Sequence, residues 1–420
     1  MPSPKNYLSL LKNGEFDHQL AKMYGPSSQK DRYEQLLTLA GTSFQGNDTI
    51  LVSAGGRTEL GGNHTDHSRG QVLAAGIHLD HLAAAEKRQE LVADIFSKGF
   101  DHIQVNLENL EPDSKEYGSP EAMVRGVAAG FAKRGWPICG FRACIDSAIP
   151  IGAGLSSSAA LGVLICLIIK KLTGNHKIST LDIARIAKEA ENLHFGKPCG
   201  FMDQIACAFN GVLHIDFADM ENPVIQPLEF DFNQHGYQLT IVQTGGSHAG
   251  LTDKYAAVPV DMAAAAGSLG HKLPTAVSMP EIIENAAKIR GDAGDMAFLR
   301  LYHFIDENKR VREQVKALKN GNIKDFIKYM RASGNSSFKY LQNCSETLST
   351  DQPIPAALAI SEYLLQGRGA CRVHGGGFAG TIQALVPLNE FAIYQKIMNN
   401  CFGDGAVVPI HIRPGGLEYF

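Results

Sequence analysis

The sequence predicts a two-domain protein of the α+β class, on the basis of its length and the order of its elements. Its 420 residues exceed the roughly 100 to 200 residues of one domain, so we expect two or three domains with sizeable cores. Strand-like and helix-like segments alternate up to residue 217, whereas the rest opens with strands, continues with helices and returns to strands. This order predicts an α/β half over residues 1–217 and an α+β half over residues 218–420, dividing near the turn-like stretch Asp219–Pro223.

The composition excludes several classes of partner. A hydrophobic fraction of 44%, a charged fraction of 20% and a net charge of -4 lack the basic surplus that nucleic-acid binding usually requires. The longest apolar run, Ala159–Ile169, is shorter than the roughly 20 residues of a membrane span, and Met1–Leu11 shows no secretory signal. Eight cysteines without a C-x-x-C pair argue against a zinc ribbon or a disulfide framework. We expect a cytoplasmic protein without nucleic-acid or membrane partners, as a monomer or weak dimer.

Short-range patterns place the elements of the first half. Asp31–Leu39 has helical spacing, and the β-branched run Thr49–Ser53 predicts a strand that feeds a loop as far as about Gly70. Helix Leu181–Leu193 places Glu191 at the edge of its apolar stripe, so we expect that side chain to be half-buried. The other predicted elements are, in order, an extended apolar Gln71–Ala85, a helix Glu121–Lys133 ended by Gly135, an alternating strand Phe141–Ser147, a loop Pro150–Leu155, an apolar helix from about Ser157, a short helix Phe201–Ala208 and a strand Gly211–Phe217.

For the second half of the chain, the sequence predicts the bounds of the strands but not those of the individual helices. Two strands open it, and several helices follow between residues 262 and 338. Alternation returns late in the chain, on both sides of the glycine-bearing loop His374–Gly377. The predicted strands are Val224–Phe230, Gln238–Gln243, Ala370–Val373, Thr381–Leu385, Ile410–Arg413 and Leu417–Phe420.

Three glycine-rich stretches carry most of the functional information, and one of them joins a predicted strand to a predicted helix. Pro150–Leu161 has the sequence P-I-G-A-G-L-S-S-S-A-A-L. Its glycines allow close backbone approach, and free amides at a helix N-terminus hold phosphate, although serines there also suit an ordinary helix cap. The stretch contains neither G-x-x-x-x-G-K-S/T nor G-x-G-x-x-G, so it predicts neither a Walker-type nor a Rossmann site.

The other two stretches are ambiguous when each is taken alone. Gly56–His67, with the sequence G-R-T-E-L-G-G-N-H-T-D-H, mixes hydrogen-bond donors and acceptors as a polyol site does. A metal site at His64, Asp66 and His67 is an alternative, although no further ligands at helical spacing support it. Arg372–Gly380, with the sequence R-V-H-G-G-G-F-A-G, indicates only a turn between strands.

Together the three stretches resemble the motifs of the GHMP kinases, and within that group those of the galactokinase family. Pro150–Leu161 is similar to the phosphate-binding motif P-x-x-x-G-L-x-S-S-A, and Gly56–His67 to the sugar signature G-R-V-N-L-I-G-E-H-T-D-Y. Arg372–Gly380 is similar to R-M-T-G-G-G-F-G-G, and Ala190–Gln204 to A-E-H followed by G and C-G-I-M-D-Q. The resemblance covers about residues 53–383.

A further match is the seven-residue step from His248 to Tyr255, which is that of the family's H-S-L-A-S-S-E-Y. The resemblance implies a two-domain GHMP kinase fold, with a ribosomal S5 domain 2-like α/β domain over residues 1–217 and a ferredoxin-like α+β domain over residues 218–420. It also implies transfer of the γ-phosphate of ATP to the anomeric hydroxyl of galactose, with ATP as co-substrate and Mg²⁺ as cofactor.

The resemblance assigns roles to individual residues. Asp203 is the implied base at the anomeric hydroxyl, and Arg57 is the cation that keeps it ionised. Ser158 and Glu191 are the implied Mg²⁺ ligands. The implied nucleotide-binding residues are Gly152, Gly154, Leu155, Ser156, Ser157 and Ser158. The implied sugar-binding residues are Asn63, His64, Asp66, Tyr255 and Gly200.

Departures from the family pattern leave specificity open. Asn63 stands where the family has a glutamate that contacts the hydroxymethyl end of the sugar, and an amide, unlike a carboxylate, also donates. A kinase for a related sugar such as galacturonate is therefore an alternative. Both aromatics of W-x-x-Y-V-K-G-V are missing, with Pro120 and Met123 in their places. Methionine packs well against a flat base, so the choice between ATP and GTP is open.

A non-catalytic galactose-sensing regulator is another alternative. Such a protein is expected to lose catalytic groups, whereas Arg57, Glu191, Asp203 and the serine loop are all present. A complete set of catalytic groups favours an active enzyme.

Overall fold

The computed structural model describes residues 2–44, 48–150, 152–245, 252–345, 350–378 and 380–416. Its helices are α1 (Pro4–Lys12), α2 (Asp17–Tyr24), α3 (Lys30–Ser43), α4 (Pro120–Lys133), α5 (Ser157–Thr173), α6 (Thr180–Leu193), α7 (Met202–Phe209), α8 (Thr252–Ser268), α9 (Met279–Glu284), α10 (Ala286–Asp292), α11 (Asp295–Lys319), α12 (Ile323–Ser336), α13 (Pro353–Leu365) and α14 (Phe391–Phe402). Its strands are β1 (Ile50–Gly61), β2 (Gln71–Lys87), β3 (Val92–Ser97), β4 (Ile103–Asn106), β5 (Phe141–Ser147), β6 (Val212–Asp216), β7 (Val224–Leu228), β8 (Tyr237–Gln243), β9 (Ala370–Val373), β10 (Thr381–Pro387) and β11 (Val407–Ile410). Over the described ranges, no helix has the length and apolar character needed to cross a bilayer.

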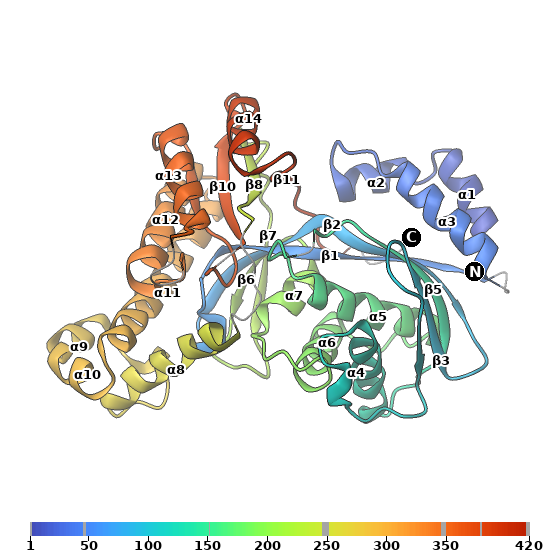
Figure 1. Cartoon of the computed structure of the whole chain (residues 1–420), viewed down its shortest axis with the longest axis horizontal. Helices are drawn as coiled ribbons and strands as arrows, with labels where there is room; N and C mark the ends of the chain where they lie inside the picture. Colours follow the sequence, from blue (N-terminus) through green and yellow to red (C-terminus); the bar gives the residue numbers. More distant parts are fainter. Residues whose placement is uncertain are drawn as a thin grey trace.

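A seven-stranded sheet is the centre of the first half of the molecule (Figure 1). Its strand order is β4-β3-β5-β2-β6-β7, and β1 pairs antiparallel with the long strand β2. Strand β7, which the sequence placed in the second half, pairs with β6 in this sheet. Near the other end of the chain, Ile412 bridges to Ile77 of β2. Both halves of the sequence therefore contribute strands to the sheet, and the division between residues 217 and 218 stays a prediction.

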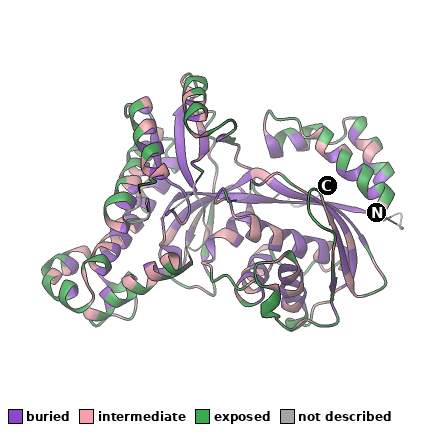
Figure 2. Ribbon diagram, viewed as in Figure 1, coloured by how far each residue is buried: buried purple, intermediate pink, exposed green. Residues whose placement is uncertain are grey.

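Successive side chains along β2 point to opposite faces of this sheet, and each face is covered by a different group of helices. Ala83 and Ala85 pack in the large core with the apolar helix α5, whereas Leu82 and Ala84 pack in a separate core with α1 to α3. Figure 1 shows these layers, with α4 to α7 on one side of the sheet and α1 to α3 on the other. In Figure 2 the strands are almost wholly buried while the helices are buried along one stripe, as amphipathic helices require.

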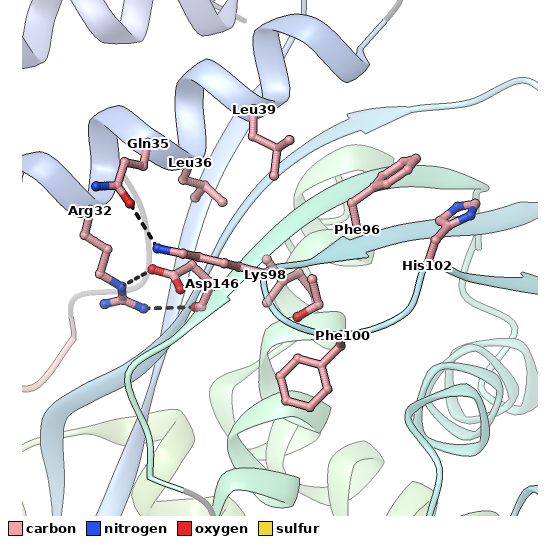
Figure 3. Close-up of a pocket in the computed structure, with 11 residues that line it drawn as sticks. Arg32, Gln35, Leu36, Leu39, Phe96, Lys98, Phe100, His102 and Asp146 are labelled. Carbon is pink, nitrogen blue, oxygen red and sulfur yellow. Dashed lines mark hydrogen bonds and ion pairs between the residues drawn. The ribbon is translucent and has the colours of Figure 1, made fainter.

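A cavity of about 410 Å³ lies between α3 and the face of the sheet at β3 and β5. Figure 3 shows that it is on the side of the sheet that faces α3. The polar side chains that line the cavity bind one another: Arg32 Nε donates to Asp146 Oδ2 at 2.7 Å, and Lys98 Nζ donates to Gln35 Oε1 at 3.0 Å. The same contacts hold the N-terminal helices against the sheet.

The second half is built around a smaller antiparallel sheet of order β11-β8-β10-β9. Leu358 of α13 and Met398 of α14 pack on one of its faces against Val242 and Ile382. Helix α12 packs against β9 of this sheet, and the long helix α11 packs against α12 and against β2 of the large sheet. The N-terminal part of α11 packs with α8 to α10 in a cluster of their own, at the left of Figure 1.

Several predicted elements are confirmed, and one prediction is wrong in a way that matters for the site. Strand Phe141–Ser147 is found as predicted, and the helices at 121–133, 157 onward and 181–193 are shifted by at most one residue. The stretch predicted as a loop from Gly56 onward is instead the continuation of β1 to Gly61. Two irregular steps in the pairing with β2, after Gly55 and after Glu59, let the strand continue through the glycines.

The other differences between the predicted and the observed elements arise from tertiary packing. Helices α1, α2, α13 and α14 and strands β3 and β4 were not predicted. The last strand of the small sheet is β11, which ends at Ile410, and residues 411–413 run beside β2. The predicted strand at residues 417–420 lies outside the described residues. Glu191, expected to be half-buried, is 1% exposed because α7 and the loop before it cover it.

Candidate active site

Arg57 of β1 and Asp203 in the first turn of α7 form an ion pair. Arg57 Nε donates to Asp203 Oδ1 at 2.7 Å, and the Ser156 hydroxyl donates to Asp203 Oδ2 at 2.6 Å. Burial alone would raise the pKa of Asp203, but the Arg57 guanidinium, the Ser156 hydroxyl and the Lys197 ammonium outweigh burial and lower it. Asp203 is therefore an ionised carboxylate at neutral pH, and its side chain remains 23% exposed.

The loop before α5 reaches this ion pair. Gly152, Gly154 and Ser156 have φ values of 72°, 65° and 61°, a left-handed conformation that glycine adopts without strain. Arg57 Nη1 donates to Gly154 O at 2.5 Å, and the Arg57 amide donates to Leu155 O at 3.1 Å. No side chain caps the N-terminus of α5. The uncapped end of α5, with its positive dipole, therefore lies beside the carboxylate of Asp203.

The three serines of the loop point to three different partners. Ser156 is bound to Asp203, as described above. The Ser157 hydroxyl lies 3.2 Å from His81 Nε2 on β2. The Ser158 hydroxyl donates to Glu191 Oε1 at 2.6 Å. The loop thereby links the base candidate, the sheet and the predicted metal ligand.

Glu191 is surrounded by donors. Besides Ser158, Gln204 Nε2 donates to Oε2 at 2.7 Å, and Lys197 Nζ donates to Oε1 at 2.9 Å. A buried carboxylate next to a hydroxyl is a hard oxygen pair that fits Mg²⁺, which takes few protein ligands and completes its shell with phosphate and water. Among the described residues no group of three or more His, Cys, Asp and Glu side chains could hold a metal ion. The alternative metal site at His64, Asp66 and His67 is therefore not formed.

The sugar signature meets the C-terminal glycine loop. His64 Nε2 donates to Gly376 O at 2.8 Å, and the Tyr255 hydroxyl donates to Gly377 O at 3.1 Å. The His64 and Tyr255 rings lie nearly parallel, with centroids 6.4 Å apart. Burial lowers the pKa of His64 to about 4, so the ring is neutral at pH 7. Burial also raises the pKa of Tyr255 to about 12.

Gly200 and Asp66 are in direct contact. A Cβ placed at Gly200 would overlap the Oδ2 atom of Asp66. The loop before α7 therefore approaches the signature so closely that any larger residue at position 200 would displace the Asp66 carboxylate. The family resemblance had placed both residues at the sugar, and the structure brings them together.

Asn63 is fully buried, and its whole amide is bound to protein atoms. Its Nδ2 donates to Gly375 O at 2.7 Å and to Glu59, while its Oδ1 accepts from Asn343 Nδ2 at 2.8 Å and from Ser337. Direct contact between Asn63 and a sugar, as predicted from the sequence, would require one of these bonds to be exchanged.

Sequence reasoning missed some groups. Lys197 was not singled out, and only its position in a loop between two motifs pointed to it. Met123, which stands in place of a family aromatic, is 0% exposed in the core beside Gly162, and the choice between ATP and GTP stays open. Tyr117, on the loop that precedes α4, is a second group that was not singled out. Its side chain is 55% exposed and lies against Gly196. His248 lies outside the described residues.

Comparison with known proteins agrees with this geometry. A family model described as the N-terminal domain of GHMP kinases matches residues 122–211, and one described as the galactokinase galactose-binding signature matches residues 42–87. The chain is 30% identical over 358 residues to the galactokinase of Thermosipho africanus, covering 84% of this chain and 93% of that protein. It is 29% identical to a galactokinase of Actinobacillus pleuropneumoniae, covering 83% of this chain and 88% of that protein.

Solved structures show the same fold. The crystal structure of Lactococcus lactis galactokinase complexed with galactose superposes with a TM-score of 0.78 at 22% identity, covering 91% of this chain and 98% of that one. The mevalonate kinase of Methanococcus jannaschii superposes with a TM-score of 0.62 at 18% identity, covering 88% and 99%. The predicted two-domain GHMP kinase fold is confirmed. With the sequence identity to its relatives over most of both chains, these matches show that the protein belongs to the galactokinase family.

Proposed function

We propose that this protein is a sugar 1-kinase that transfers the γ-phosphate of ATP to the anomeric hydroxyl of galactose, giving galactose 1-phosphate. The observation that carries the proposal is the ionised carboxylate of Asp203, held by Arg57 and Ser156 beside the uncapped N-terminus of α5. Phosphoryl transfer requires alignment, charge neutralisation and an acceptor for the proton of the hydroxyl. The family membership supports the choice of reaction and sugar.

On the sugar side, Asp203 accepts the proton of the anomeric hydroxyl as that oxygen bonds to the γ-phosphorus and the bond from this phosphorus to the bridging oxygen breaks, releasing ADP. Arg57 keeps Asp203 ionised beforehand and offsets negative charge during transfer. Asp66, His64 and Tyr255 bind sugar hydroxyls, and Gly200 makes room for Asp66. Because His64 is neutral at pH 7 and its Nε2–H donates to Gly376 O, its Nδ1 is able to accept a hydrogen bond from a sugar hydroxyl. Asn63 acts indirectly in this proposal, by holding the loop at Gly375.

On the nucleotide side, backbone amides bind the phosphates. The residues proposed for this are Gly152, Gly154, Leu155, Ser156, Ser157 and Ser158. Their support is the left-handed loop geometry and the positive end of α5. Ser158 and Glu191 would hold Mg²⁺, which neutralises phosphate charge when it is bound.

Location and assembly complete the proposal. We infer a cytoplasmic protein, because the eight cysteines, which are all in described residues, are free thiols and disulfides form mainly in oxidising compartments. A monomer or weak dimer with two domains, divided near residue 217, is sufficient for this reaction because the site is built from one chain.

The test is a coupled ADP-release assay with Mg²⁺-ATP across galactose, glucose, N-acetylgalactosamine, galacturonate and homoserine. Turnover with galactose, and phosphorylation at the anomeric carbon by ³¹P NMR, is the expected result. Turnover with galacturonate alone would establish the related-sugar alternative. Absence of turnover with all five compounds, together with measurable galactose binding, would establish the sensing regulator. GTP at equal concentration tests the nucleotide preference.

A further inference from the structure

Lys197 lies in the loop between α6 and α7, with its ammonium at the predicted metal ligands. Lys197 Nζ is 2.9 Å from Glu191 Oε1 and 3.4 Å from the Ser158 hydroxyl. Its backbone amide donates to Glu191 O at 3.1 Å, so the end of α6 fixes its Cα. Lys197 is therefore placed by three contacts, one from its main chain and two from its ammonium.

The exposed fractions of the Glu191 and Lys197 side chains show which of the two residues is able to move. The Glu191 side chain is 2% exposed, whereas the Lys197 side chain is 52% exposed. Glu191 is fixed by Gln204 and Ser158 as well, while the four-carbon stem of lysine is flexible and ends in three donors. Lys197 is thus a half-exposed cation at the open side of a buried carboxylate.

The same ammonium lies within electrostatic range of the residues that bind the sugar. It lowers the pKa of Asp203, after the stronger effects of burial, Arg57 and Ser156, and it opposes the rise that burial causes in the pKa of Tyr255. In the loop before α5, Ser158 contacts the Lys197 ammonium and Ser156, two residues earlier, contacts Asp203. Lys197 therefore lies near the space between the predicted metal ligands and the predicted base. A phosphate transferred between nucleotide and sugar has to occupy that space.

We propose that Lys197 neutralises Glu191 in the free enzyme and turns to the transferred phosphate when nucleotide is bound. A buried carboxylate without a counter-charge is costly, so an ammonium at Glu191 stabilises the site before a divalent cation arrives. Once Glu191 and Ser158 bind that cation, the Lys197 ammonium is free to donate to phosphate oxygens. Lys197 makes and breaks no covalent bond in this process. The inference rests on the proposed kinase function and adds a cation that the sequence motifs do not contain.

The test compares three variants. Lys197→Met removes the charge and keeps the length of the stem, Lys197→Arg retains the charge, and Lys133→Met removes an exposed lysine at the end of α4 as a control. Calorimetry with a non-hydrolysable ATP analogue and Mg²⁺ gives a readout that does not need turnover. A charge-assisted hydrogen bond to phosphate corresponds to about a tenfold or larger change in affinity. We expect that loss in Lys197→Met, near-complete rescue in Lys197→Arg and no change in Lys133→Met.

Activity supplies the second readout. In Lys197→Met the kcat should fall at least about tenfold, while the galactose KM changes much less, because the ammonium contacts the phosphate and not the sugar. Analogue affinity equal to wild type in a folded Lys197→Met variant would overturn the inference and leave Lys197 as a partner of Glu191 only. If Lys197→Met does not fold, an analogue affinity of Lys197→Arg far below wild type has the same consequence. Absence of turnover in the wild type would instead refute the proposed function, and the calorimetric comparison would still decide the role of Lys197.

Discussion

Glu59 and Asn63 contact each other in the core of the signature: Asn63 Nδ2 lies 3.1 Å from Glu59 Oε1 and 3.3 Å from Oε2. The family signature that the sequence resembles has Asn at the first of these positions and Glu at the second, so this chain carries the same two side chains in exchanged order. The carboxylate of Glu59 also pairs with Arg372, which is 0% exposed. One carboxylate, one amide and one guanidinium thus join the signature to the C-terminal glycine loop.

This contact predicts that Glu59 and Asn63 compensate for each other. Glu59→Asn would leave buried Arg372 without its counter-charge, at a cost of about 3 to 5 kcal/mol, and Arg372 already has two nitrogens without a protein partner among the described residues. Asn63→Glu would bring a second carboxylate beside Glu59. The double exchange restores one carboxylate and one amide.

Thermal unfolding and galactose KM of the two single variants and the double variant measure this coupling. We expect both single variants to be destabilised and the double variant to be closer to wild type than the sum of the two effects. Simple additivity of the two changes would show that the positions act independently.

Asp203→Asn should abolish turnover and retain sugar binding. The amide keeps the shape of the carboxylate and its contact with Ser156, but it cannot accept the proton of the anomeric hydroxyl. Galactose binding is measured by calorimetry and turnover by ADP release. A variant that kept more than a few per cent of the wild-type kcat would exclude Asp203 as the essential base.

Arg57 should set the pH at which Asp203 works. Because Arg57 is the largest of the influences that lower the pKa of Asp203 against burial, the wild-type rate should persist at pH values below the ordinary range of a carboxylate. In Arg57→Met burial is less opposed, so the pKa of Asp203 rises and the acid limb of the kcat/KM profile moves to higher pH.

Arg57→Lys is the control for this profile, because it retains the charge and loses the two-point contact with Asp203 and Gly154. Its acid limb should lie between those of the wild type and Arg57→Met. Coincident acid limbs for all three proteins would assign the titration to another group.

Gly200→Ala should weaken galactose binding and leave nucleotide binding intact. The added Cβ overlaps the Asp66 carboxylate, which must then rotate or move away from the sugar. Gly291→Ala is the matched control, because a Cβ at this helical glycine of α10 meets no atom within 4 Å. Calorimetry with each ligand measures the effect. Unchanged galactose affinity in Gly200→Ala would remove Asp66 from the sugar site.

Glu191→Gln should raise the Mg²⁺ concentration needed for half-maximal activity. The amide retains the size of the side chain but is a weaker ligand for a hard cation than a carboxylate. Titration of free Mg²⁺ at saturating ATP measures the shift, and Glu189→Gln, on a more exposed part of α6, is the control. An unchanged Mg²⁺ requirement would show that Glu191 is not a metal ligand.

Local sequence patterns were sufficient to predict the elements and motifs whose cause is local. Strand β5, helices α4, α5 and α6 and the glycine and serine loop before α5 follow from periodicity, turn residues and left-handed positions, all of which depend on neighbours within a few residues. The family resemblance rests on the same short stretches, and so does the assignment of Arg57 and Asp203, whose contact the structure shows.

Which distant residues meet depends on the packing of elements that are far apart in the chain. This packing turned the expected loop after Gly56 into strand, buried Met123, enclosed the amide of Asn63, and brought Lys197 to Glu191. The pairing of Glu59 with Arg372 joins residues more than 300 positions apart. Contacts of this kind depend on the packing of whole sheets and helices against one another, and no short-range pattern in a single sequence encodes the distance between them.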